Sequence, residues 1–96
     1  MQLAELQDLM RRTYLERDER RGLDASFRRL VEEIGELARA LRRDDPANKE
    51  EELGDALAWL VSLANQAGID VEAAAGRYAS GCPKCGDIPC ECPFGP

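Results

Sequence analysis

Apolar residues recur every three or four positions through most of the first 80 residues, which is the spacing of a helix face buried against neighbouring helices. No segment shows the alternation of apolar and polar residues that indicates a strand. We therefore expect an all-α, four-helix bundle-like fold with helices over residues 2–20, 24–43, 46–67 and 70–80. The two central helices carry the longest apolar stripes, which are Phe27, Leu30, Val31, Ile34, Leu37, Ala38 and Leu41, and then Leu53, Ala56, Leu57, Leu60, Ala64 and Ala67.

The expected helix ends rest on capping residues and on helix breakers. Asp24 or Ser26 is expected to cap the second helix, and Pro46 suits the first turn of the third. Gly68 is expected to end the third helix, and Asp70 to cap the fourth.

Composition divides the chain into a helical body, residues 1–80, and a tail, residues 81–96, that holds all four cysteines and four of the five prolines. A chain of 96 residues has room for one small domain. No apolar stretch approaches the ~20 residues of a membrane span, so we expect no membrane partner. The first residues lack the features of a signal peptide, so we expect a cytoplasmic protein.

The balance of 13 basic against 19 acidic residues argues against nucleic-acid binding, which normally needs a basic surface. The chain has no histidine, which excludes imidazole catalysis and imidazole metal ligands. Carboxylates are therefore the expected catalytic groups.

An acidic segment occurs twice, as Glu32-Glu33-Ile34-Gly35-Glu36 and as Glu51-Glu52-Leu53-Gly54-Asp55. The two segments lie on equivalent flanks of the second and third helices, beside their apolar stripes. A short connection favours antiparallel packing of these helices, which would bring the two flanks together. A glycine inside a helix costs about 1 kcal/mol relative to alanine, so the repeated glycines suggest a need for room beside the carboxylates.

The repeat predicts a metal site. Glu33 with Glu36, and Glu52 with Asp55, are spaced one helical turn apart, and clustered carboxylates suit Mg²⁺ or Mn²⁺. The alternative is a solvated acidic face with helical ion pairs, such as Glu36 with Arg39 or Glu32 with Arg28. The second segment has no basic residue three or four positions after Glu50–Glu52, and the duplicated spacing therefore favours the metal site.

The two motifs, Glu-Glu-x-x-Glu at residues 32–36 and Glu-x-x-Asp at residues 52–55, resemble those of MazG-type nucleotide pyrophosphohydrolases, which are all-α NTP pyrophosphatases. The resemblance covers residues 3–80 and includes the flanks 37–41 and 56–60 and the segment 63–70. It implies hydrolysis of a nucleoside triphosphate between the α- and β-phosphates, with Mg²⁺ held by Glu33, Glu36, Glu52 and Asp55. Such an enzyme would clear unwanted nucleotides.

Other roles are assigned by position. Glu32, beside the metal ligands, is the expected catalytic base, although Glu32 and Glu36 can exchange the base and ligand roles. Many relatives have a lysine and an asparagine near the fourth helix that bind the substrate's phosphates. In this region the present chain has Arg77, which either replaces the lysine or is simply an exposed charge. Trp59, like Tyr14 and Phe27, can stack on a nucleobase or belong to the core.

The tail contains Cys82-Pro83-Lys84-Cys85 and Cys90-Glu91-Cys92. In a cytosolic chain this spacing favours a Cys₄ zinc site, Cys82, Cys85, Cys90 and Cys92, over disulfides. The short gap between the pairs leaves open a tail of metal-free cysteines or a flexible end.

The body is too small to enclose both a core and a substrate cleft, so we expect a homodimer or a dimer of dimers with shared apolar faces. Two other functions stay open. One is that of a phosphoribosyl-ATP pyrophosphohydrolase, which has the same carboxylate pattern. The other is that of a non-catalytic helical interaction module with a zinc-binding tail.

Overall fold

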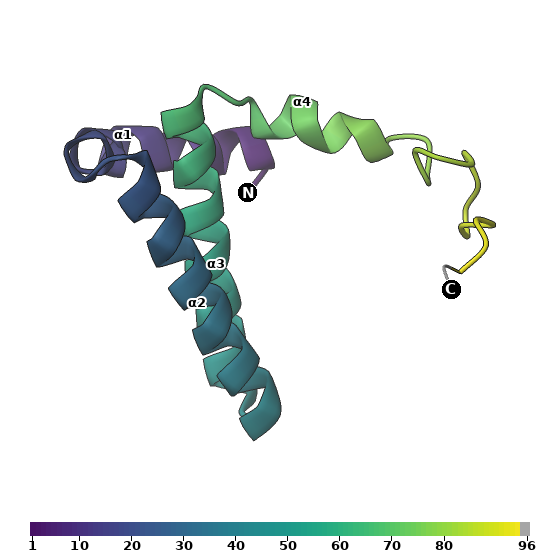
Figure 1. The fold of residues 1–96 in the computed structure, drawn as a ribbon, viewed down its shortest axis with the longest axis horizontal. Coiled ribbons are helices and arrows are strands. Elements are labelled where there is room, and N and C mark those ends of the chain that lie inside the picture. The colour runs from purple at the N-terminus through teal and green to yellow at the C-terminus, as the bar shows by residue number, and fades with distance from the viewer. Residues whose placement is uncertain (95–96) are drawn as a thin grey trace.

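The computed structural model describes residues 1–94, and the last two residues of the predicted tail, 95–96, lie outside the described residues. The described chain contains helices and no strand, which confirms the all-α prediction. In chain order the elements are α1 (Leu3–Arg21), α2 (Leu23–Arg43), α3 (Pro46–Ala67), α4 (Val71–Ala75) and the 3₁₀ helix η1 (Gly76–Tyr78) (Figure 1). Among these residues, no helix is both long and apolar enough to cross a membrane.

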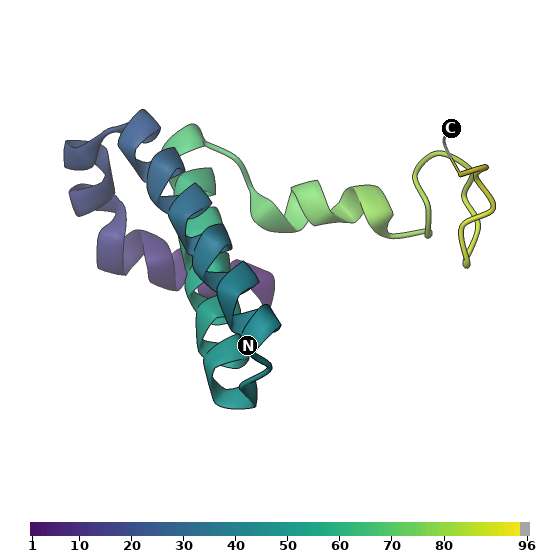
Figure 2. The same ribbon diagram turned by 60° about the horizontal axis from the view of Figure 1, so that its bottom comes forward.

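Helices α2 and α3 lie side by side and antiparallel, and we call residues 23–67 the α2–α3 hairpin (Figures 1 and 2). Helix α1 crosses one end of this hairpin, where it packs mainly on α3. Helix α4 points away from the hairpin and ends in the cysteine-containing tail (Figure 1). The two acidic segments therefore both lie on the α2–α3 hairpin.

Turns between the helices follow from residues with special backbone geometry. Gly22 alone separates α1 from α2, and its φ of 95° is strained for any residue with a side chain. Asp44 ends α2 in the left-handed conformation with φ 54°, and Asp45 then caps α3 by accepting a hydrogen bond from the Asn48 backbone N–H at 3.3 Å. Gly68 ends α3 with φ 72°, as predicted.

Two predicted boundaries are wrong. Neither Asp24 nor Ser26 caps α2, because this helix begins directly after Gly22 and both residues lie inside it. The fourth helix begins after its predicted cap, Asp70, but is α-helical only to Ala75. Gly76 is a poor helix former, and α4 is almost wholly exposed to solvent. Tertiary packing therefore contributes little to stabilise further α-helical turns after Ala75.

Polar side chains fasten α1 to the rest of the chain. The Gln7 amide donates to the Ile69 carbonyl at 2.7 Å and accepts from the Val71 N–H at 2.9 Å. Asn65 donates to the Gln7 carbonyl at 3.1 Å, and Gln66 donates to the Asp18 carbonyl at 2.8 Å. These bonds fix the crossing of α1 over α3 and the departure of α4.

The apolar core of the single chain is small. The buried apolar residues among residues 1–94 are Leu30, Ala40, Ala56 and Val61. Much of each predicted stripe is instead exposed to solvent, and we call these exposed residues the apolar flank: Phe27, Val31, Ile34 and Leu41 of α2, and Leu53, Leu57 and Leu60 of α3. At about 100° per residue, Phe27 and Glu33 lie on opposite sides of the buried Leu30, so the apolar flank runs along the side of the hairpin opposite the acidic segments.

Candidate functional site

Three carboxylates meet across the α2–α3 hairpin. One carboxylate oxygen from each of Glu33, Glu52 and Asp55 lies within 4.8 Å of the other two, and we call this group the carboxylate cluster. Glu52 and Asp55 lie one turn apart on α3, and Glu33 lies opposite them on α2. The Glu33 side chain is 13% exposed, Glu52 is half-buried and Asp55 is exposed. Such a hard oxygen donor set, open on one side, fits Mg²⁺ or Mn²⁺.

The cluster is electrostatically unfavourable by itself. Partial burial raises the pKa of the Glu52 carboxyl above its ordinary value, and the negative charges of Asp55, Glu33, Glu36 and Glu51 raise it further. A divalent cation between these oxygens would convert the repulsion into attraction. The chemistry of the donor set therefore favours a bound metal ion.

Arg29 joins the cluster to its surroundings. Its guanidinium lies 2.5 Å from Glu32 Oε2 and 3.2 Å from Glu33 Oε1. The structure thus pairs Glu32 with Arg29 instead of the expected Arg28, because Arg29 lies between the two glutamates and α3. Its guanidinium also lies over the Trp59 ring, 5.1 Å from the centroid. Nothing in the sequence pattern distinguishes Arg29 from the other arginines near it.

The other two predicted carboxylates lie beside the cluster. Glu32 has a 59% exposed side chain and is held to Glu33 through their shared arginine. Glu36 is 47% exposed and pairs with Arg39 at 3.5 Å, as expected. Its charge contributes to the raised pKa of Glu52, so it faces the cluster without belonging to it. The four predicted metal ligands therefore divide into three that meet and one at the margin.

A cavity of about 140 Å³ adjoins the cluster. Its lining includes Asp55, Trp59, Tyr14, Asp18 and Arg21. Asp18 is 3% exposed, and its Oδ1 accepts a hydrogen bond from Arg21 at 2.6 Å, whereas its buried Oδ2 has no hydrogen-bond partner among residues 1–94. The predicted substrate residue Trp59 thus lies beside a cluster carboxylate, with Arg21 4.9 Å from its ring centroid.

A family profile described as the MazG nucleotide pyrophosphohydrolase domain matches residues 21–81, which is more than half of the chain. The chain belongs to the MazG family. The match confirms the resemblance drawn from the two acidic motifs, and the whole carboxylate cluster lies inside it. A sequence search of curated proteins found no match. As a member of the MazG family, the chain is related to nucleotide pyrophosphohydrolases, and this family uses divalent metal ions.

Arg77 lies in η1, at the end of the matched MazG segment. Its guanidinium lies 5.8 Å from the centroid of the Tyr78 ring. Helix α4 carries this segment away from the α2–α3 hairpin (Figure 2). A single MazG chain therefore does not bring Arg77 to the carboxylate cluster, and its phosphate-binding role stays a prediction.

The repeated glycines of the MazG motifs do not make room for a neighbour within one chain. A Cβ atom added at Gly35 or Gly54 would meet nothing within 4 Å. Gly35→Ala should therefore raise the free energy of unfolding by about 1 kcal/mol, the difference in helix propensity, as measured by urea denaturation. Gly68→Ala, at φ 72°, is the contrasting control and should destabilise the fold. A loss of stability in Gly35→Ala would contradict the prediction and indicate that another chain packs against this glycine.

The four cysteines of the tail also come together, beyond the end of the MazG match at residue 81. One Sγ atom from each of Cys82, Cys85, Cys90 and Cys92 lies within 4.8 Å of the other three. Backbone N–H groups of Cys85 and Lys84 lower the pKa of Cys82 to about 6, whereas the neighbouring thiols, Cys90 first, raise the pKa of Cys92 to about 11. The tail thus holds a second, chemically different donor set.

Proposed function

We propose that this MazG protein hydrolyses a nucleoside triphosphate between the α- and β-phosphates and releases a nucleoside monophosphate and pyrophosphate. The observation that supports this proposal is the carboxylate cluster, in which two antiparallel helices present three hard ligands within 4.8 Å of one another. Glu33, Glu52 and Asp55 would hold Mg²⁺, with Glu36 at the margin. Bound there, Mg²⁺ neutralises phosphate charge and polarises the phosphoryl oxygens.

The chain's own residues orient the reactants around this centre. Arg29 holds Glu33 in place through its ion pair and its contact with Trp59. Glu32 is exposed beside the cluster, so its carboxylate can accept the proton of a water molecule that attacks one of the two phosphorus atoms of the α–β anhydride. The oxygen of that water enters one product, and the α–β bridging oxygen leaves with the other. In this proposal Glu32 is the base and Glu36 is the carboxylate that can exchange roles with it.

We propose that the active protein is a homodimer, or a dimer of dimers. The apolar flank leaves Phe27 54% and Leu41 58% exposed, and the buried apolar core within residues 1–94 comprises four residues. Burying such a flank against a second copy supplies the hydrophobic free energy that the single chain lacks. The 140 Å³ cavity is also smaller than the roughly 300–1,000 Å³ of typical ligand sites, so a partner chain is needed to complete the substrate cleft.

Two residues are proposed to contact the nucleotide. Trp59 lines the cavity beside Asp55, so a base stacked on its ring would place the phosphates near the cluster. Arg77 is proposed to bind phosphate across the dimer interface, because it belongs to η1, and the segment beyond α4 lies away from the α2–α3 hairpin in its own chain.

A nucleotide screen tests the proposed function. Purified protein with Mg²⁺ should convert at least one nucleoside or deoxynucleoside triphosphate to equal amounts of monophosphate and pyrophosphate, and a chelator should abolish turnover. Detection of pyrophosphate and inorganic phosphate in parallel separates the two possible cleavage positions. Diphosphate with inorganic phosphate as products would contradict the proposal. Turnover of phosphoribosyl-ATP alone would assign the chain to that reaction instead.

A further inference from the structure

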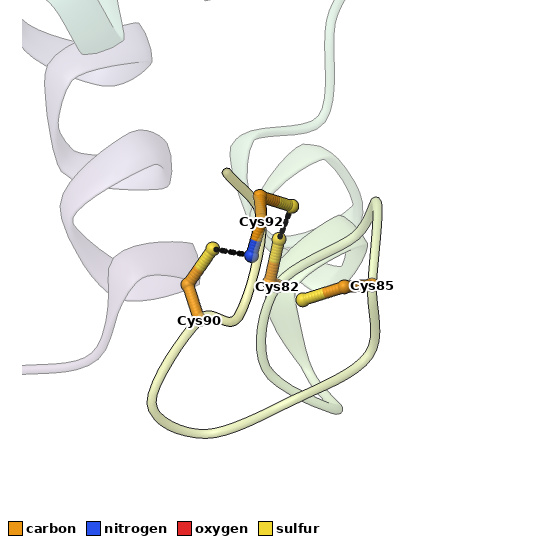
Figure 3. A group of neighbouring side chains, drawn as sticks. All are labelled: Cys82, Cys85, Cys90 and Cys92. Carbon is orange, nitrogen blue, oxygen red and sulfur yellow. Dashed lines mark hydrogen bonds between the residues drawn. The ribbon is translucent and has the colours of Figure 1, made fainter. Parts of the chain in front are cut away.

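The tail beyond η1 folds around its four cysteines (Figure 3). Cys82 and Cys92 have their Sγ atoms 3.7 Å apart, although nine residues separate them in the sequence. Cys85 points toward the same centre from the first loop, which comprises residues 82–86. Cys90 reaches this centre from the second loop, which comprises residues 87–92. All four cysteines are free thiols in the structure.

We propose that Cys82, Cys85, Cys90 and Cys92 bind one zinc ion in a tetrahedral Cys₄ site. Zinc–sulfur bonds of about 2.3 Å place the sulfur atoms of a tetrahedron about 3.8 Å apart. The Cys82–Cys92 separation of 3.7 Å matches this value, and the limit of 4.8 Å on all pairs leaves room for one ion. A multi-iron cluster would hold its cysteines farther apart, because the cluster itself lies between them.

The backbone around the thiols supports a metal site. The Glu91 N–H points at Cys85 Sγ, and the Cys92 N–H points at Cys90 Sγ, both at 3.4 Å. Hydrogen bonds of this kind orient thiolate ligands and offset their charge. The first loop is closed by the Gly86 N–H, which donates to the Cys82 carbonyl at 2.7 Å, and Gly86 has the positive φ of 78° that the turn requires. The Cys82–Cys85 pair is therefore already arranged as a two-ligand loop.

The tail has almost no other source of stability. Ile88 is 81% exposed and Phe94 is fully exposed, and the other described residues of the tail, within 81–94, are exposed or at most partly buried. Segments this short usually need a metal or disulfides to hold one conformation. A zinc ion that crosslinks two loops supplies this constraint, and metal binding and folding of the tail then become one event.

The zinc site is chemically and spatially separate from the carboxylate cluster. Thiolates are soft ligands that select zinc over magnesium, whereas the carboxylates are hard. The tail lies beyond α4, away from the α2–α3 hairpin that carries the cluster (Figure 1). The proposal therefore does not rest on the proposed nucleotide hydrolysis.

Elemental analysis of the full chain, purified under reducing conditions without chelator, tests the proposal. We expect one zinc per chain. The variants Cys82→Ser and Cys92→Ser should each retain less than roughly a tenth of this zinc, because three thiolates do not complete the tetrahedral site. Lys84→Ser, which changes a non-ligand in the same loop, should retain full zinc. Glu52→Gln should also retain it, which separates this site from the magnesium site.

Two further measurements keep the result decisive. Replacement of zinc by Co²⁺ should give the visible absorption of tetrahedral cobalt thiolate, and removal of zinc should make the tail, but not the helical body, sensitive to protease. Four reactive thiols without metal after incubation with zinc would overturn the proposal. So would disulfides in the reduced preparation, seen as the loss of two hydrogens per bond in the intact mass, or a stoichiometric content of iron in place of zinc.

Discussion

Glu52→Gln will lower the rate of pyrophosphate release at least about a hundredfold, because it removes a charged ligand from the carboxylate cluster. Glu52 lies one turn from Asp55 and opposite Glu33, so no other carboxylate of α3 can replace it without a change in the helix. The measurement is the steady-state rate with saturating Mg²⁺ and the preferred triphosphate.

The same substitution will stabilise the metal-free fold. Partial burial and neighbouring carboxylates raise the folded-state pKa of Glu52. A raised folded-state pKa means that stability falls as pH rises through it, since the folded protein binds the proton more tightly than the unfolded chain. At neutral pH without metal, the wild-type fold therefore contains an unfavourable charge that glutamine lacks. Thermal unfolding in chelator should show a higher midpoint for Glu52→Gln, and the difference should shrink in mild acid.

Magnesium will reverse this order. A ligand at 100 times its dissociation constant stabilises the folded state by about 2.7 kcal/mol, and the wild type alone should gain this stabilisation in full. Glu50→Gln is the matched control, because Glu50 lies about 160° from Glu52 and about 140° from Asp55 around the axis of α3. The control should keep wild-type activity and the wild-type response to Mg²⁺. An active Glu52→Gln enzyme, or an unchanged response to Mg²⁺, would show that the cluster does not hold the catalytic metal.

Phe27→Glu and Leu41→Glu will dissociate the proposed dimer. Both residues belong to the apolar flank, and both lie away from the carboxylate cluster on α2. Each side chain is about half exposed in one chain, so its burial in the dimer contributes about half of the roughly 2 kcal/mol of hydrophobic free energy for full burial. The contribution counts twice, because the symmetric interface contains the residue from both copies. The buried glutamate adds a desolvation cost. We expect the dissociation constant to rise at least about thirtyfold.

Sedimentation over a range of concentrations measures this effect. The wild type should sediment at twice the mass of one chain, or at four times for a dimer of dimers, and the variants should shift to the monomer with parallel loss of activity. Ala47→Glu is the control, because Ala47 is exposed in the first turn of α3 outside the apolar flank. A wild-type protein that stays monomeric at micromolar concentrations would refute the shared interface.

The sequence was sufficient to predict where the helices lie, but it was insufficient to predict some of the residues at which they begin and end. Periodicity placed α1, α2 and α3 within a residue or two, because their amphipathic spacing is long and regular. The residue that precedes α2 was mispredicted, as Asp24 or Ser26, because Gly22 permits two helices to follow each other with a single residue between them. The length of α4 was overestimated because its pattern gave no information about how little it would pack.

Within the candidate site, the repeated acidic motif led to Glu33, Glu52 and Asp55 because spacing along two helices fixes which flank each carboxylate occupies. The motif could not separate these three from Glu36, since that distinction depends on the distance between helices. Arg29, Arg21 and Asp18 gave no signal, because they occur within highly charged segments. The places of Asp18 and Arg21 beside Trp59 follow from the crossing of α1 over the hairpin, and that of Arg29 follows from the packing of α2 against α3.

By itself, the sequence determined the helical class and the helix faces and indicated the candidate donor residues, because these depend on residues near one another in the chain. The tertiary structure decided which predicted core residues remain exposed, which carboxylates meet and how the four thiols converge. These outcomes depend on contacts between segments far apart in sequence, and local periodicity contains no information about such distances.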